Sequence, residues 1–207
     1  MSVPSISVIG AGNIGSAVAG LAVKAGASTQ VLVRDTSKAS SLSGVDVAEI
    51  GSPLTGDIVV LALPYAAIDD VIAAYGAQAF AGKVVVDPTN PLDFTTLDSL
   101  VPAGSSAAAE LAVRLPGAQV VKAFNTVFAA VLASGTIGAR PATVLAASDS
   151  AEAKTSLRSF VEAAGLTWAD AGELNRAERL EALGALNIAL GVTEQVAWTG
   201  GLAVVSE

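Results

Sequence analysis

Two chemically versatile residue types are absent from this chain of 207 residues, which contains no cysteine and no histidine. The lack of cysteine excludes disulfides and thiol nucleophiles, and the lack of both types excludes the usual Cys/His zinc sites. Without histidine there is neither a Ser-His-Asp triad nor a histidine proton relay. The sequence therefore excludes several hydrolytic and zinc-dependent mechanisms, and we expect no metal site.

Charged and aromatic residues are also scarce, at 14% and 4%, and acidic residues exceed basic ones to give a net charge of −8. A surface for nucleic acid or an anionic membrane needs clustered Lys and Arg, so this balance argues against both partners. Hydrophobic residues make up 52% of the chain, which excludes intrinsic disorder. Apolar runs such as Asp57–Ala67 stop well short of the roughly 20 residues that a spanning helix needs. With no targeting segment evident at Met1, we expect a soluble, cytoplasmic protein.

Short β-branched runs alternate with longer Ala-rich stretches along most of the chain. The runs are nearly continuous in Val, Ile or Leu, which is typical of strands buried on both faces. Strands are expected at Ser5–Ile9, Thr29–Val33, Asp57–Ala62, Lys83–Asp87, Gln119–Lys122 and Thr143–Ala147, and helices at Ile14–Ala25, Ala66–Ala79 and Ser105–Leu115. This alternation predicts an α/β fold, a Rossmann-type parallel sheet with helices on both faces.

The last quarter of the chain has a different pattern. Two residue pairs there have the spacing of a capping box, Asp149 with Glu152 and Asn175 with Glu178. The first pair predicts a helix to Ala164, and the second predicts a long helix toward Ala197. Because no linker or repeat separates this part, we expect a single domain over residues 1–207. Its core would span about 1–148, and a C-terminal helix-strand-helix cap would span 149–207.

A glycine-rich loop follows the first expected strand and opens the first helix. It has the spacing G-x-G-x-x-G in a strand–loop–helix context, which is the fingerprint of dinucleotide binding. The first glycine permits the tight turn, the second lets the backbone approach a pyrophosphate, and the third lets helix and strand pack closely. The expected cofactor-binding residues of this loop are Gly10, Ala11, Gly12, Asn13, Ile14 and Gly15.

The end of the second expected strand discriminates between the two nicotinamide cofactors. NAD-binding proteins usually place a carboxylate there, roughly 20 residues after the glycines. Here Val33 takes that position and Arg34 follows it, and a guanidinium can hold a 2′-phosphate. Further donors would come from Thr36, Ser37 and Lys38. The pattern favours NADP, although Asp35 makes NAD competitive if its side chain points inward.

Four segments spread over nearly the whole chain carry a family resemblance. They are Gly10–Gly15 with Arg34, Val59–Tyr65, Val120–Thr126, and Asp170–Gly172 followed by Ala177–Leu183. Together they resemble the NADPH:coenzyme F-420 oxidoreductases, which are deazaflavin-dependent NADP reductases, and the related reductase domain of the STEAP metalloreductases. The resemblance implies hydride transfer between C4 of the nicotinamide and C5 of the deazaflavin, without a metal, by subunits that pair as dimers.

The resemblance also assigns roles to residues beyond the glycine loop. It implies that Leu63, Pro64 and Tyr65 cover the dinucleotide, and that Asn125 and Val127 line the contact between nicotinamide and deazaflavin. Tyr65 is also the one plausible proton donor near the strand ends, but a ring that covers the cofactor is the more common role for such a residue.

Several polar residues follow expected strands, at the edge where α/β proteins bind ligands. Pro88 and Asn90 belong to a turn after the fourth strand that is either a pocket wall or an ordinary rigid turn. Asn125 and Thr126 interrupt an apolar stretch and must find backbone or ligand partners, and we expect contact with a ring.

On the last expected helix, Gly184, Asn187 and Gly191 share one face. Two glycines inside a helix indicate close approach by a deazaflavin or by a helix of another subunit, and helix packing is the more common explanation. We include Asn187 among the expected substrate-binding residues. The carboxylates of Glu173, Glu178 and Glu181 are interpreted as caps and solvated faces.

These observations predict an NADP-dependent oxidoreductase that uses NADP(H) and a deazaflavin, coenzyme F-420, and that acts as a homodimer. Hydride transfer between planar rings depends on stacking and on exclusion of water, so no catalytic acid or base is assigned. Two alternatives stay open. One is an NADPH-dependent reductase of a flavin or another small acceptor, and the other is a non-catalytic NADP-binding sensor or subunit.

Overall fold

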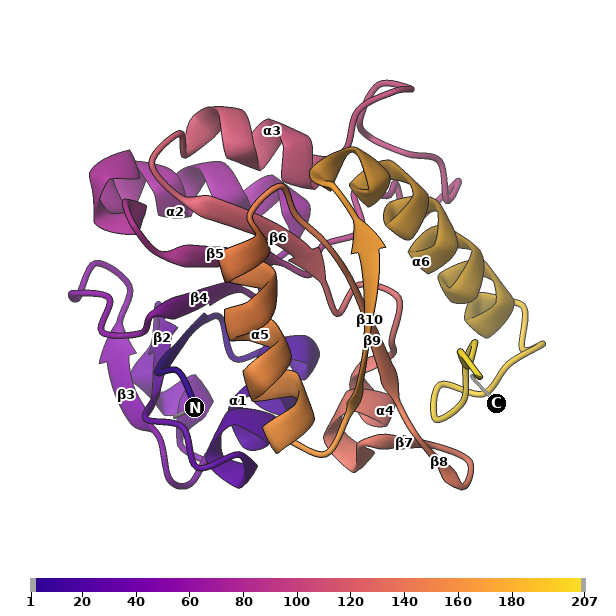
Figure 1. Cartoon of the computed structure of the whole chain (residues 1–207), viewed down its shortest axis with the longest axis horizontal. Coiled ribbons are helices and arrows are strands. Elements are labelled where there is room, and N and C mark those ends of the chain that lie inside the picture. Colours follow the sequence, from indigo (N-terminus) through magenta and orange to yellow (C-terminus); the bar gives the residue numbers. More distant parts are fainter. Residues whose placement is uncertain (1–2, 206–207) are drawn as a thin grey trace.

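In the computed structural model, which describes residues 3–205, one eight-stranded sheet runs through the molecule in the order β10-β9-β6-β5-β4-β1-β2-β3 (Figure 1). Its strands are β1 (Ile6–Ile9), β2 (Thr29–Val33), β3 (Asp46–Glu49), β4 (Ile58–Leu61), β5 (Val84–Asp87), β6 (Gln119–Ala123), β9 (Thr143–Ala147) and β10 (Thr167–Gly172). A separate two-stranded hairpin consists of β7 (Thr136–Ile137) and β8 (Arg140–Pro141).

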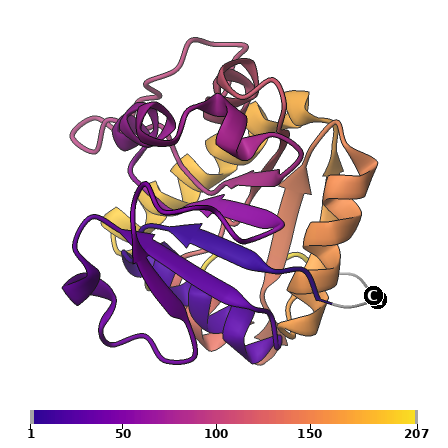
Figure 2. The ribbon, with the colours of Figure 1, turned by 90° about the vertical axis from the view of Figure 1, so that its left-hand side faces the viewer.

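Helices cover both faces of this sheet (Figure 2). They are α1 (Asn13–Lys24), α2 (Ile68–Tyr75), α3 (Ala107–Arg114), α4 (Ala129–Ser134), α5 (Ala151–Ala163) and α6 (Ala177–Val192). The buried side chains of α1, α4 and α5 form one core on the sheet, and those of α2, α3 and the start of α6 form another. Every residue of β1, β2, β4 and β5 is buried, which explains why these strands are rich in Val, Ile and Leu. The expected α/β Rossmann-type fold with a C-terminal helix is confirmed.

Two strands, β9 and β10, run opposite to the other six, in contrast to the fully parallel sheet expected from the sequence. β9 runs antiparallel to β6, and β10 then runs parallel to β9. The chain between β6 and β9 contains only α4 and the β7–β8 hairpin, and it returns to the sheet at the end where β6 stops. An antiparallel neighbour needs no crossover in that case, and the hydrophobic pattern of a strand does not reveal its direction.

The sequence pattern did not predict the edge strand β3 or the short helix α4, and it gave α2 too great a length. β3 lies at the edge of the sheet and is mostly exposed, so its polar composition is typical of a loop. α4 spans six residues and was not expected. The helix expected over Ala66–Ala79 is shorter, because the chain leaves α2 at Gly76 with a φ of +71°.

Both expected capping boxes are wrong, although the helices that follow them are present. Ser150 caps α5, since its side chain accepts a hydrogen bond from the backbone N–H of Ala153 at 3.1 Å. The Asp149 carboxylate instead accepts from the N–H of Leu174. No side chain caps α6, which ends at Val192 and not near Ala197. Within residues 3–205 no helix is long and apolar enough to cross a membrane.

Candidate active site

The carboxyl ends of β1, β4, β5 and β6 meet the start of α1, and two cavities lie there beside the glycine loop. The first, here called the Arg34 cavity, has a volume of about 410 Å³ and is lined by Gly10, Ala11, Gly12, Val33, Arg34, Asp35, Lys38, Ile50, Ala62, Leu63 and Pro64. The second, here called the Asn125 cavity, has a volume of about 460 Å³. It is lined by Asn13, Ile14, Pro88, Asn90, Phe94, Asn125, Val127, Phe128, Ala129, Ala130, Ile188 and Trp198.

The three glycines of the loop have different reasons to be glycine. Gly10 has a φ of +104°, and a Cβ there would collide with the carbonyl oxygen of Ala62. A Cβ at Gly15 would collide with the carbonyl oxygen of Gly10, so these two glycines let strand and helix pack closely. Around Gly12 nothing lies within 4 Å of that position, and no side chain caps α1. The positive end of α1 therefore faces open space, an arrangement suited to an anion.

Two cations border the Arg34 cavity without a partner. Arg34 and Lys38 are exposed, and neither forms an ion pair within residues 3–205. Asp35 Oδ1 accepts hydrogen bonds from the hydroxyl of Ser37 at 2.7 Å and from its backbone N–H at 3.0 Å. These bonds lower the pKa of Asp35 and hold its carboxylate on the short 3-10 helix over Thr36–Ala39. The arrangement leaves positive charge free to meet a phosphate.

Tyr65 is turned toward α3 and does not line either cavity, in contrast to Leu63 and Pro64. Its hydroxyl donates to Glu110 Oε2 at 2.5 Å, and that carboxylate also pairs with Arg114. Burial and the neighbouring Glu110 carboxylate raise the pKa of Tyr65. Its hydroxyl is therefore occupied in a structural contact.

A reciprocal pair of amides forms the wall of the Asn125 cavity. Asn90 Nδ2 donates to the carbonyl of Asn125, and Asn125 Nδ2 donates to Asn90 Oδ1, both at 2.9 Å. Asn125 Nδ2 also donates to the carbonyl of Leu180 in α6 at 2.8 Å. Only 6% of Asn125 is exposed, and among the described residues its Oδ1 has no hydrogen-bond partner. The structure thus brings together residues expected separately and leaves one buried acceptor beside the cavity.

A residue with a strained backbone, Phe124, precedes the asparagine wall of the Asn125 cavity. Phe124, directly before Asn125, has a φ of +69° and is fully buried. Such a conformation costs of order 1–3 kcal/mol for a non-glycine residue and persists only where packing imposes it. It turns the chain at the end of β6 so that Val127 lines the cavity. Thr126 and Asn187 do not line it, and Asn187 Nδ2 supports the turn by donating to the carbonyl of Thr126 at 3.2 Å.

An aromatic rim around the Asn125 cavity was not anticipated from the sequence. The rings of Phe128 and Trp198 have centroids 4.7 Å apart, and Phe94 and Trp198 remain 73% and 51% exposed. A Cβ at Gly191 would lie 3.1 Å from the Trp198 ring, so this glycine makes room for it. Likewise, a Cβ at Gly184 would collide with Asn90 Oδ1. The two helix glycines are thus explained by packing within the chain.

A buried ion cluster beneath the site was also missed. Lys122 Nζ contacts Asp87 Oδ2 at 2.8 Å, Glu181 Oε1 at 2.7 Å and the carbonyl of Thr89 at 2.6 Å. We call Asp87, Lys122 and Glu181 the Lys122 triad. The interpretation of Glu181 as a cap or solvated residue is wrong, because only 6% of it is exposed and it packs on Lys122. Burial raises the pKa of Glu181, and the nearby Lys122 ammonium opposes that shift.

Glu173 and Glu178, which were also interpreted as caps or solvated residues, differ from Glu181 in their exposure. Glu178 is exposed, and it accepts a hydrogen bond from the N–H of Gly104 at 2.8 Å instead of capping its own helix. Glu173 is exposed. In the described part of the chain no three side chains of the metal-binding types gather into a cluster.

One family model matches part of the chain. Residues 5–91 match the model of the family described as NADP oxidoreductase, coenzyme F420-dependent. Metalloreductase STEAP3 of Rattus norvegicus is 30% identical over 186 residues, which are 87% of this chain and 36% of that protein. The chain thus spans about a third of the length of this relative.

Two solved structures share the fold. A candidate F420-dependent NADP-reductase from Arthrobacter sp. FB24 has a TM-score of 0.82 at 24% identity, covering 98% of this chain and 100% of that one. Hypothetical protein SMa0349 from Sinorhizobium meliloti has a TM-score of 0.73 at 30% identity, covering 82% and 85% respectively. The family resemblance deduced from the four sequence segments is confirmed.

Proposed function

We propose that the chain, whose residues 5–91 match the family model for coenzyme F420-dependent NADP oxidoreductases, binds NADP(H) along the glycine loop and transfers a hydride between this cofactor and a deazaflavin. The observation that carries the proposal is the pair of exposed cations, Arg34 and Lys38, which have no ion-pair partner among residues 3–205 and lie beside the open start of α1. They supply the charge that a 2′-phosphate and a pyrophosphate need.

The donor set fits NADP better than NAD. Arg34 and Lys38 would hold the 2′-phosphate, while Gly12 leaves room for the pyrophosphate at the start of α1. Ser37 already occupies Asp35 Oδ1, so a two-oxygen contact with both ribose hydroxyls, the usual role of an acidic residue in NAD proteins, would compete with these bonds.

The Asn125 cavity has the properties that a hydride-transfer site requires. When bound there, the nicotinamide supplies the hydride from its C4 atom. Asn125 Oδ1 would accept a hydrogen bond from the carboxamide, a role supported by its lack of another partner among the described residues. Val127 and Phe128 exclude water from the ring. No proton donor is needed, which is consistent with the engagement of the Tyr65 hydroxyl by Glu110.

The acceptor is proposed to be coenzyme F-420 because the rim of this cavity is aromatic. Phe94, Phe128 and Trp198 offer ring faces and edges to a planar molecule. A flavin would fit the same rim and is the second candidate acceptor.

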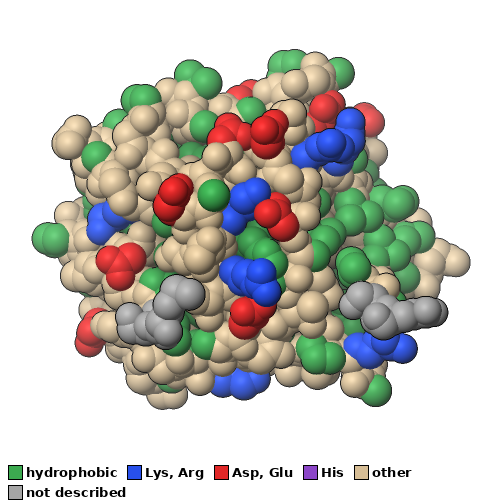
Figure 3. All heavy atoms as spheres, viewed as in Figure 1, with side chains coloured by type: hydrophobic (Ala, Val, Ile, Leu, Met, Phe, Trp, Pro, Cys, Tyr) green, Lys and Arg blue, Asp and Glu red, His purple; other side chains and the backbone are tan. Residues whose placement is uncertain are grey.

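We further propose that the protein acts in the cytoplasm as a homodimer. Hydrophobic side chains gather on the side of the molecule where α6 and the following segment lie (Figure 3). The exposed residues there are Leu186, Val192, Leu202, Val204 and Val205. An apolar surface of this kind is typical of an interface between subunits, and light scattering after gel filtration would report the mass of the particle.

The deciding experiment is anaerobic mixing of the protein with oxidised deazaflavin and NADPH, with bleaching of the deazaflavin band as the signal. NADH and FMN run in parallel. Bleaching with NADPH and not with NADH supports both the acceptor and the role of Arg34. Turnover of FMN alone moves the protein to the flavin-reductase alternative, and NADPH binding without any turnover moves it to a sensor or subunit. The absence of NADPH binding would refute the proposal entirely.

A further inference from the structure

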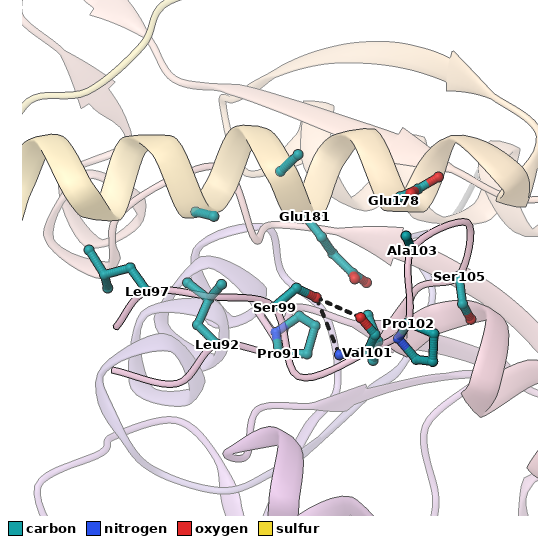
Figure 4. Close-up of a pocket in the computed structure, with 12 residues that line it drawn as sticks. Pro91, Leu92, Leu97, Ser99, Val101, Pro102, Ala103, Ser105, Glu178 and Glu181 are labelled. Carbon is teal, nitrogen blue, oxygen red and sulfur yellow. Dashed lines mark hydrogen bonds between the residues drawn. The ribbon is translucent and has the colours of Figure 1, made fainter. Parts of the chain in front are cut away.

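A third cavity, of about 420 Å³, lies between α6 and the loop that connects β5 to α3 (Figure 4). We call it the Glu181 cavity. None of its lining residues lines the Arg34 cavity or the Asn125 cavity, so it is separate from the proposed redox site. Its walls are mainly hydrocarbon, contributed by Pro91, Leu92, Leu97, Val101, Pro102 and Ala185.

The charged groups of this cavity all have one sign. Glu178 and Glu181 line it, and no lysine or arginine does. In Figure 4 the Glu181 side chain points from α6 toward the loop that contains Ser99 and Val101, and Glu178 lies one turn earlier. Glu178 is exposed, whereas Glu181 is buried at the inner wall.

The Lys122 triad leaves this inner wall with an excess of negative charge. Its single ammonium contacts three acceptors, Asp87, Glu181 and the carbonyl of Thr89. One positive charge therefore faces two carboxylates, and the net charge of the ionised triad is −1. The further donor to Glu181 is the N–H of Ala107, at 3.2 Å. An unbalanced charge in apolar surroundings is costly, and a cation in the cavity would remove that cost.

We propose that the Glu181 cavity binds a small organic ammonium ion with a compact apolar body. The apolar walls would hold the body, and the carboxylate of Glu181 would accept hydrogen bonds from the ammonium group. A bare divalent metal ion fits less well, because such ions take six or more oxygen ligands and these walls are mostly hydrocarbon. Burial raises the pKa of Glu181, and a bound ammonium would act with Lys122 to keep this carboxylate ionised.

The test compares two probes of the same shape on the full chain, 2-phenylethylammonium and the neutral 2-phenylethanol, by titration calorimetry. The ammonium is expected to bind about tenfold more tightly than the alcohol, as one charge-assisted hydrogen bond provides. Glu181→Gln should abolish this difference, and Glu178→Gln should reduce it less because Glu178 is exposed. Equal affinity for the two probes, or no binding of the ammonium, would overturn the proposal.

A second variant covers the case in which Glu181→Gln does not fold. Ala185→Phe fills the cavity without removing any group of the Lys122 triad and should abolish binding of the ammonium while NADPH affinity is kept. Ala163→Phe, at an exposed position of α5, is the matched control and should bind the probe like the unchanged chain. Unchanged probe affinity in Ala185→Phe would show that the ammonium binds elsewhere, and the proposal would be wrong.

Discussion

The two ends of the proposed redox site are built by opposite means. At the Arg34 end, two cations are exposed and have no ion-pair partner in the described chain, so their position is free to adjust to a phosphate. At the Asn125 end, Asn90 and Asn125 are held by reciprocal hydrogen bonds, and the Lys122 triad is buried directly below. The comparison indicates that one end selects a ligand by charge and the other by fixed shape.

The largest loss of stability is expected when the Lys122 triad, at the Asn125 end, loses its ammonium group. Lys122→Met leaves the carboxylates of Asp87 and Glu181 buried without their cation, which should lower the free energy of unfolding by about 3–5 kcal/mol. Arg158→Met is the matched control, because its ion pair with Glu162 is exposed and contributes at most about 0.5 kcal/mol. Chemical denaturation measures both, and a loss below about 1 kcal/mol for Lys122→Met would contradict the role given to the triad.

A smaller loss of stability is expected when a methyl group is added against the asparagine pair at the Asn125 end. Gly184→Ala places a Cβ against Asn90 Oδ1 and Asn125, and should destabilise the protein by roughly 1–3 kcal/mol. Gly20→Ala on α1 meets nothing within 4 Å and should instead stabilise it by up to about 1 kcal/mol. Thermal unfolding of the two variants compares them directly. Stabilisation by both would mean that α6 does not press on the asparagine pair.

At the Arg34 end, a substitution should change NADPH binding without changing the free energy of unfolding. Arg34→Ala should weaken NADPH binding about tenfold and leave NADH binding unchanged, because one charge-assisted contact to a 2′-phosphate is lost. Added salt should weaken NADPH binding to the unchanged chain more than to the variant. Arg140→Ala, at an exposed residue of β8, is the control. Equal losses for NADPH and NADH would contradict the assignment of the 2′-phosphate to Arg34.

The smallest effect concerns pH. The folded chain raises the pKa of Glu181 above its ordinary value of 4.5, so folding favours the protonated carboxyl. The stability that Glu181 contributes is therefore complete below pH 4.5 and is lost as the pH rises through its folded pKa. Compared with Glu181→Gln, the unchanged chain should lose stability across this window. Parallel pH–stability curves of the two proteins would argue against this shift.

The two ends of the site also differ in how far they can be predicted from the sequence. The glycine loop and Arg34 are recognisable because their neighbours in the chain are also their neighbours in space. The Lys122 triad joins residues 35 and 59 positions apart, so its partners depend on the assembled fold. A signal was nevertheless present, since Lys122 interrupts an apolar strand and a lysine buried there must have a counter-charge. The direction of β9 and the position of Trp198 had no comparable local signal.

The order of strands in the sheet has a consequence for how the chain is made. β1 is synthesised first and lies inside the sheet, with β2 and β3 on one side and β4, β5, β6, β9 and β10 following outward on the other. Each strand that leaves the ribosome therefore finds an existing edge, and none has to insert between two strands already paired. The nascent chain can build the sheet from the N-terminal end, and β10 closes it last.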